Sequence, residues 1–190
     1  LLREKNNLTK GLLKKKEIGH VKKHDTSENL VKSIYLGIGS NLGNKRSNIE
    51  KAKFKLTEFG IKILKSSSYY ESFSWPNRKN PKFLNIILEI FTNLKSSELL
   101  EKCKKIELEL GRKKSSKNSP RICDIDIIDY KNYQLRKKII LPHPRMHTRN
   151  FVLLPLFELN KDWRHPVSKN HIKTLIFALS NSDISSIKQI

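Results

Sequence analysis

The most informative run of residues is Pro120-Arg121-Ile122-Cys123-Asp124-Ile125-Asp126-Ile127-Ile128. Its apolar residues, bounded by a proline, predict a buried β-strand. Because alternate side chains of a strand share a face, Asp124 and Asp126 are expected on the same side, roughly 7 Å apart. Ile125 and Ile127 are then directed into the core. Carboxylates rarely enter such a run unless something binds them, so the pair marks a candidate site.

Two carboxylates on one strand face, with Arg121 beside them, form a site for hard cations that carry phosphates. The alternative is an exposed edge strand whose acids are only solvated. A basic, polar loop at residues 112–119 leads into the strand and bears on this choice. Charge runs are usually solvated surface, but a mobile basic loop beside two metal-binding acids is more often a lid over phosphates. The flanking sequence therefore favours a metal and phosphate site.

The chain has 190 residues and a net charge of +21, which is enough length for one domain preceded by an extension. We expect a domain at residues 33–190 and a basic, disordered extension at residues 1–32, whose acidic residues argue against a targeting presequence. A basic surface attracts nucleic acids, membranes or small anions alike, so the charge does not choose a partner. No apolar run is long enough to span a bilayer, which predicts a soluble, cytoplasmic protein. Cys103 and Cys123 are expected to be reduced and buried.

The residues from 33 onward predict alternating strands and helices. The strands are expected at 33–38, 61–70, 83–91 and 120–128, and the helices between them at 47–59 and 96–110. This β-α-β-β-α-β order is the ferredoxin-like arrangement of an α+β protein, with the helices on one face of the sheet. A short strand at 138–141 and C-terminal helices at 151–159 and 172–179 follow, and the last helix is expected to pack onto the sheet.

A glycine-rich turn at residues 39–44 joins the first strand to the first helix. Ser47 and Glu50 form a capping box there, with Ser47 as the N-cap. Such a turn could cradle a phosphate, but the motif lacks the spacing and the Lys-Ser/Thr ending of a P-loop. We therefore interpret it as a tight turn.

Three further polar side chains have open roles. Asn85, inside the third strand, is either a structural hydrogen-bonding group or a reader of a ligand. His143 and His147 are four residues apart, but Pro144 and the absence of an intervening glutamate argue against a zinc motif. We interpret both histidines as phosphate-facing or structural.

Several motifs occur in one order along the chain: Gly39-Ser40-Asn41-Leu42-Gly43, Asn80-Pro81-Lys82-Phe83-Leu84-Asn85, Leu110-Gly111-Arg112, the acidic strand, Leu141-Pro142-His143-Pro144-Arg145-Met146 and Arg149-Asn150-Phe151-Val152. With this order and spacing, residues 33–180 resemble the hydroxymethyl-dihydropterin pyrophosphokinases of the folate pathway. The resemblance implies transfer of the pyrophosphoryl group of ATP to the hydroxymethyl group of the reduced pterin, giving AMP and the pterin diphosphate. We expect these two small molecules to be the partners, with no membrane, no specific nucleic acid and a monomeric chain.

The resemblance also implies roles for individual residues. The catalytic set is Arg112, Arg121, Asp124 and Asp126, in which Asp124 and Asp126 hold two Mg²⁺ ions. Contacts to ATP and its phosphates fall to Glu107, Arg112, Lys114, Arg121, Ile128, His143 and Arg149. Contacts to the pterin fall to Ser72, Phe73, Trp75, Phe83, Asn85 and Phe151. Arginine suits the phosphate positions because its guanidinium can bind two oxygens at once.

The chain departs from the family pattern in two loops. The family usually carries arginine where Lys114 and Lys117 stand, and Trp-Gly where Asn118-Ser119 stands. In the pterin-side loop, the usual Thr, Pro and Gly positions hold Ser72, Ser74 and Pro76. Since the acids and the core arginines remain, we interpret the chain as an active enzyme with an altered lid.

Two other classes of protein are consistent with parts of the sequence. A metal-dependent nuclease or phosphodiesterase would use the acidic pair and the basic surface, and its binding to nucleic acid would depend steeply on salt. A non-catalytic RNA-binding module of ferredoxin-like fold would need aromatic side chains on the central strands, and the acidic pair opposes it. The order of the motifs favours the pyrophosphokinase.

Overall fold

The structure is a computed structural model that describes residues 32–113, 116 and 118–190. The extension predicted at residues 1–32 lies outside the described residues, apart from Lys32. Lys114 and Lys117 of the predicted lid also lie outside them. Within the described part of the chain, no helix has both the length and the apolar character needed to cross a membrane.

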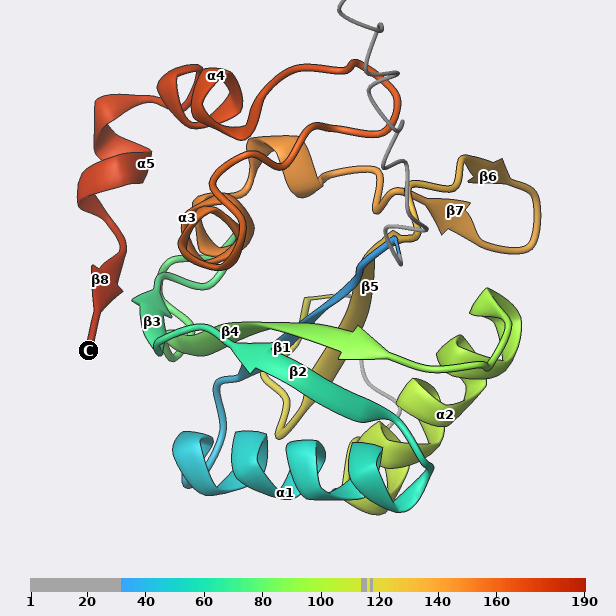
Figure 1. Ribbon diagram of the computed structural model, residues 1–190. Coiled ribbons are helices and arrows are strands. Elements are labelled where there is room, and N and C mark those ends of the chain that lie inside the picture. Colours follow the sequence, from blue (N-terminus) through green and yellow to red (C-terminus); the bar gives the residue numbers. More distant parts are fainter. Residues whose placement is uncertain (1–31, 114–115, 117) are drawn as a thin grey trace, which may run out of the picture. The chain divides into compact units, whose positions relative to one another are not determined.

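A six-stranded antiparallel sheet forms the centre of the domain (Figure 1). Its strands are β1 (Ile34–Ser40), β2 (Lys62–Ser66), β3 (Tyr70–Ser72), β4 (Phe83–Phe91), β5 (Asp124–Tyr130) and β8 (Lys188–Gln189). They follow the order β5-β1-β4-β3-β8, and β2 also pairs with β4. Strands β6 (Leu135–Arg136) and β7 (Ile140–Leu141) form a separate two-stranded sheet. The predicted ferredoxin-like α+β arrangement is confirmed.

The helices lie in two layers on opposite faces of the sheet (Figure 1). One layer holds the predicted pair, α1 (Lys45–Glu58) and α2 (Ser96–Glu109). The other holds α3 (Asn150–Leu159) and α4 (Ile172–Phe177), preceded by the 3₁₀ turn Met146–Thr148 and followed by α5 (Asn181–Ser185). Helix α4 packs against α3, which in turn packs against β4.

Each helical layer shares its own hydrophobic core with the sheet. Ile125 and Ile127 of β5 belong to the core under α1 and α2, as the alternation in the sequence predicted. Ile128 belongs to the second core, under α3 and α4. Cys103 and Cys123 are buried and free, and burial raises the pKa of each thiol to about 12. Both behave as small apolar core residues, as expected.

Two boundaries differ from the prediction because a side chain replaces a backbone hydrogen bond. The single strand expected at 61–70 is wrong: Ser67 separates β2 from β3, since its Oγ accepts the N–H of Ile87 in β4 at 2.9 Å. The N-cap of α1 is Asn44 and not Ser47, because Asn44 Oδ1 accepts the N–H of Ser47 at 3.0 Å. Ser47 therefore lies inside the first turn of α1. Asparagine is as favourable an N-cap residue as serine.

Strand β5 begins at Asp124, four residues later than Pro120. The segment before it is bound by the glycine-rich turn instead of a neighbouring strand. Asn41 Oδ1 accepts the N–H of Arg121 at 2.7 Å, and the N–H of Asn41 donates to the carbonyl oxygen of Arg121 at 3.1 Å. The predicted turn at 39–44 is shorter than expected, because Gly39 and Ser40 belong to β1, and the turn that follows holds the entry to the acidic strand.

Candidate active site

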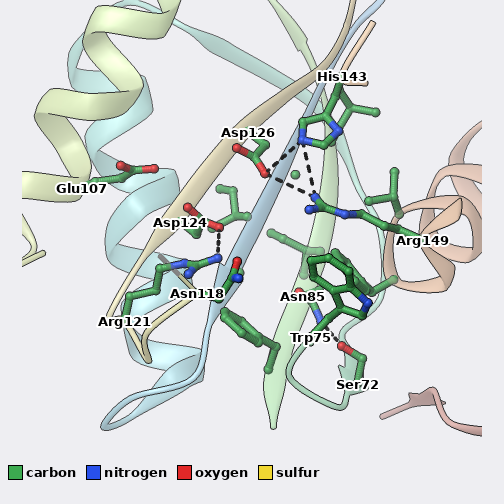
Figure 2. Close-up of a pocket in the computed structure, with 18 of the residues that line it drawn as sticks. Ser72, Trp75, Asn85, Glu107, Asn118, Arg121, Asp124, Asp126, His143 and Arg149 are labelled. Atoms are coloured by element: carbon green, nitrogen blue, oxygen red, sulfur yellow. Dashed lines mark hydrogen bonds and ion pairs between the residues drawn. The ribbon is translucent and has the colours of Figure 1, made fainter. Parts of the chain in front are cut away.

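A cavity of about 620 Å³ opens beside the acidic face of β5 (Figure 2). Thirteen of the predicted site residues line it: Ser72, Trp75, Phe83, Asn85, Glu107, Arg112, Arg121, Asp124, Asp126, Ile128, His143, Arg149 and Phe151. They come from β3, β4, α2, β5, α3 and the loops between these elements. Elements that lie far apart in the sequence thus converge on one cavity.

Phe73 is not brought into this cavity. It lines a smaller adjoining cavity of about 270 Å³, which Ser72 and Trp75 also line. The reason is strand alternation: Ser72 and Ser74 are buried, and Phe73 between them points the other way. There its ring lies under the cations of Lys82 and Arg78, at 4.9 and 5.3 Å from the ring centroid. Phe151 lines this smaller cavity as well, so Phe73 shares it with three of the other residues predicted to contact the pterin.

Two glycines of β1 form the floor between the acids and Asn85. Gly39 pairs with Asp124 on one side and with Asn85 on the other, and Gly37 pairs with Asp126. A Cβ on Gly39 would come within 3.1 Å of Asn85 Oδ1 and 3.3 Å of the Phe83 ring. Since neighbouring strands lie about 4.8 Å apart, the acidic row and the asparagine row are separated by about 10 Å across this open floor.

Asp124 is held between two arginines. Arg112 Nη1 lies 2.7 Å from Asp124 Oδ1, and Arg121 Nη2 lies 2.7 Å from Oδ2. Burial acts to raise the pKa of Asp124, but the charges of Arg121 and Arg112 outweigh it and hold the pKa below its usual range. Asp124 is therefore a carboxylate whose two oxygens both carry a cationic partner.

Asp126 is the more open of the two acids, with 35% of its side chain exposed. His143 Nε2 and Arg149 Nη1 each lie 3.8 Å from its Oδ2 (Figure 2). Burial lowers the pKa of His143 despite the nearby carboxylate. His143 Nδ1 accepts the N–H of Arg145 at 3.2 Å, and His143 Nε2 lies between Asp126 and Nη1 of Arg149, which is 3.5 Å away.

Asn85 lies at the other end of the cavity, where the aromatic side chains gather. Its amide nitrogen donates to Ser72 Oγ at 3.0 Å and to the carbonyl oxygen of Tyr70 at 3.2 Å. These two bonds fix the orientation of the side chain and leave Oδ1 on the side of the glycine floor. Figure 2 shows Trp75 beside Asn85, across the cavity from the acids. This end of the cavity can therefore bind a flat polar ring, with Asn85 Oδ1 as a fixed hydrogen-bond acceptor and the aromatic side chains as stacking surfaces.

Comparison with known proteins bears on what this cavity does. Residues 35–161 match the model of one protein family, described as 7,8-dihydro-6-hydroxymethylpterin-pyrophosphokinase (HPPK). The chain is 43% identical over 142 residues to 2-amino-4-hydroxy-6-hydroxymethyldihydropteridine pyrophosphokinase of Aquifex aeolicus, which covers 74% of this chain and 88% of that protein. The chain belongs to this pyrophosphokinase family.

Other relatives agree. The Bacillus subtilis protein of the same name is 37% identical over 127 residues, covering 66% of this chain and 76% of that protein. A solved Plasmodium falciparum HPPK-DHPS chain superposes with a TM-score of 0.63 at 15% identity, covering 83% of this chain and 47% of that one, and supports the fold. The pyrophosphokinase transfers the pyrophosphoryl group of ATP to hydroxymethyldihydropterin in folate synthesis. The nuclease and RNA-binding alternatives are not favoured.

Several residues that line the cavity of the pyrophosphokinase were not predicted. They are Gly37, Ile38, Gly39, Ile86, Ile87, Lys104, Leu108, Lys113, Ser116, Arg145 and Val152. Lys104 could have been found, because it lies three residues before Glu107 on the same face of α2 and pairs with it at 2.8 Å. Arg145 could not, since its position over the Trp75 ring, 5.3 Å from the centroid, joins two distant loops.

The acidic pair fits a magnesium site that the substrate completes. Among residues 32–113, 116 and 118–190, no group of three or more His, Cys, Asp or Glu side chains is placed to hold a metal. Mg²⁺ commonly takes one or two carboxylates and fills its octahedron with phosphate oxygens and water, so Asp124 and Asp126 provide an adequate donor set. Enzymes of this family use ATP and typically Mg²⁺. Each oxygen of Asp124 has one arginine partner, so a cation bound there would share this carboxylate with Arg112 and Arg121.

Proposed function

We propose that Asp124 and Asp126 hold two Mg²⁺ ions, and that the cavity binds ATP at the acidic end and the pterin at the Asn85 end. The observation that carries this proposal is the row formed by Asp124, Gly39 and Asn85 on neighbouring strands. With Asp126, which pairs with Gly37 two residues along β5, this row supports a floor that carries two carboxylates and a fixed amide acceptor. When bound, Mg²⁺ would neutralise phosphate charge and polarise the β-phosphorus.

The phosphate end is proposed to consist of Arg112, Arg121, His143 and Arg149, with Lys114 from the lid. The guanidinium of Arg121 has a further donor to offer, because its Nε is buried and has no hydrogen-bond partner among the described residues. His143 would contact a phosphate oxygen through Nε2, which lies beside Arg149. Ile128 would supply an apolar wall for the nucleotide. Together these groups orient the triphosphate so that the β-phosphorus faces the pterin.

The pterin end is proposed to consist of Asn85, Ser72 and the aromatic side chains of Trp75, Phe83 and Phe151. Asn85 Oδ1 would accept a hydrogen bond from the pterin edge, and Ser72 keeps the amide from rotating. The hydroxymethyl oxygen then attacks the β-phosphorus. The bond from that phosphorus to the oxygen of the α-phosphate breaks, AMP leaves, and the hydroxyl proton is released. The diphosphate ends on the pterin.

The acting unit is proposed to be residues 33–190, as a monomer in the cytoplasm. The two hydrophobic cores support these domain bounds, because they are built from residues 34–175. The oligomeric state and the location remain predictions from the sequence.

The test is a direct assay of the products. Protein, Mg²⁺ and ATP should release AMP when hydroxymethyldihydropterin is added, in equal amount to the pterin diphosphate, and should release none without the pterin. Release of ADP, or of AMP in the absence of pterin, would contradict the proposed arrangement. A short oligonucleotide, titrated at several salt concentrations in the presence of Mg²⁺, serves as the control for the nuclease and RNA-binding alternatives.

A further inference from the structure

Glu107 is a buried carboxylate next to the site whose two oxygens are both engaged. Its side chain is 2% exposed. Oε1 accepts the N–H of Ile125 in β5 at 2.7 Å and lies 2.8 Å from Lys104 Nζ. Oε2 lies 2.6 Å from Arg112 Nη1. A buried charge is tolerated when it is paired and hydrogen-bonded in this way, and such a group has little capacity left for a ligand.

Arg112 is shared between Glu107 and the acid of the site. The same Nη1 that binds Glu107 lies 2.7 Å from Asp124 Oδ1. Arg112 is also attached through its backbone, because its N–H donates to the carbonyl oxygen of Glu107 at 3.0 Å. This return of the chain onto the end of α2 follows Gly111, whose φ of +95 disfavours other residues. Arg112 therefore has one partner that belongs to the framework and one that belongs to the site.

The contacts of Arg112 with Asp124 and with Glu107 should respond differently to the binding of a metal ion. A metal on Asp124 would compete with Arg112 for the charge of that carboxylate, whereas Glu107 cannot leave Ile125 without breaking a buried hydrogen bond to β5. If Arg112 depended on Asp124 alone, metal binding would weaken its attachment. Glu107 gives the same Nη1 a second anchor, so Arg112 keeps its place in the lining of the cavity.

We propose that Glu107 is a positioning residue, which holds Arg112 at the phosphate end when Asp124 binds Mg²⁺. This inference rests on the proposed function, and it replaces the nucleotide contact that the family resemblance implied for Glu107. The consequence is that Glu107 affects nucleotide affinity through Arg112 and leaves pterin affinity unchanged, because Asn85 and the aromatic side chains lie at the other end of the cavity.

The test is a double-mutant cycle on the binding of Mg²⁺ with a non-hydrolysable ATP analogue, measured by calorimetry. Glu107→Gln and Arg112→Ala should each weaken binding about tenfold, and adding Glu107→Gln to Arg112→Ala should cost less than about threefold more. Glu109→Gln is the matched control, since Glu109 lies on the same helix and is ion-paired with Lys55 at 2.6 Å, away from the cavity. The affinity of Glu109→Gln for the ATP analogue should stay within about twofold of wild type.

Three outcomes overturn the inference. Equal affinity of Glu107→Gln and wild type, with a lower melting temperature, would show a purely structural role. Losses that multiply in the double variant would show that Glu107 contacts the nucleotide itself. No binding by wild type would contradict the proposed function, and this inference with it. If Glu107→Gln does not fold, Glu107→Asp keeps the charge but is too short to reach both Ile125 and Arg112, and it should weaken binding in the same way.

Discussion

Asn41 binds the backbone of Arg121 through two of its groups: its side-chain oxygen accepts the N–H of Arg121 at 2.7 Å, and its backbone N–H donates to the carbonyl oxygen of Arg121 at 3.1 Å. The amide nitrogen of the same side chain donates to Ser74 Oγ and to the carbonyl oxygen of Pro81, each at 3.2 Å. One buried asparagine therefore joins the glycine-rich turn, the loop at 72–81 and the entry to the acidic strand. The two ends of the active site are built on a common anchor.

Asn41→Ala should consequently impair both ends of the site. It leaves the N–H of Arg121 without its acceptor in a partly buried position and removes the two bonds to the loop, so we expect a loss of about 2–4 kcal/mol in the free energy of unfolding. Affinities for the nucleotide analogue and the pterin should fall together. Asn44→Ala, which removes only the helix cap, should cost about 1 kcal/mol and spare both affinities. A loss confined to one substrate would argue against a shared anchor.

Substitution of Asp124 and of Asp126 should change the stability of the protein by different amounts, although both acids are expected to be needed for transfer. Asp126→Asn should abolish turnover with little change in unfolding by urea, because its cationic neighbours lie 3.8 Å away. Asp124→Asn should also abolish turnover but destabilise the protein by about 1–3 kcal/mol, because it leaves Arg112 and Arg121 facing a neutral amide. Near-native turnover in either folded variant at saturating Mg²⁺ would refute the metal assignment.

Asp129 should titrate in the folded protein near neutral pH. It is fully buried, and burial raises its pKa to about 6, despite the bond from Trp163 Nε1 to its Oδ2 at 3.0 Å. Since this pKa lies above the unfolded value, the folded state holds the proton more tightly. The stability that Asp129 contributes is thus present below about pH 4 and is lost as the pH rises through about 6.

Trp163 offers a direct readout of that titration. In Trp75→Phe it is the remaining tryptophan of the two in the chain, and its fluorescence should change with a midpoint near pH 6. Adding Asp129→Asn should abolish the change. The nearby His165, whose ring lies 5.9 Å from that of Trp163, is the competing source. Persistence of the transition in the double variant would assign it to His165.

Asn118→Trp tests how the altered lid closes. Asn118 lines the cavity, where the family carries a tryptophan, and an aromatic contact adds about 0.5–1.5 kcal/mol beyond burial. Asn118 also has a φ of 66. Asparagine tolerates this left-handed conformation, whereas tryptophan adopts it at a cost of about 1 kcal/mol or more. Pterin affinity with the ATP analogue bound should therefore improve less than about threefold. A gain of tenfold would show that the lid changes its backbone on closing.

Removal of residues 1–30 should leave kcat/KM and the melting temperature unchanged. The sequence of that segment lacks the periodicity of a packed element, so it is expected to contribute no contacts to the domain. Thermal unfolding and the AMP-release assay on the shortened chain check this directly. A marked loss in either measurement would mean that the segment packs on the domain.

The sequence by itself determined those features that depend on neighbours along the chain. The alternation around Asp124 and Asp126 placed both acids on one face and Ile125 and Ile127 in the core, because the strand period is a local property. The helical stripe containing Cys103 and the strand containing Asn85 followed from the same kind of pattern. The order of the motifs then indicated the family.

Only the tertiary structure decided which distant groups meet. Asn41 and Arg121 are 80 residues apart, and no local pattern shows that the glycine-rich turn holds the acidic strand. Gly39 reads as a turn residue in the sequence, yet its function in the sheet is to leave space between Asp124 and Asn85. No local pattern shows that Glu107 is buried between α2 and β5, where it binds the N–H of Ile125 and the guanidinium of Arg112. Such contacts depend on the geometry of packed elements, which a one-dimensional pattern does not encode.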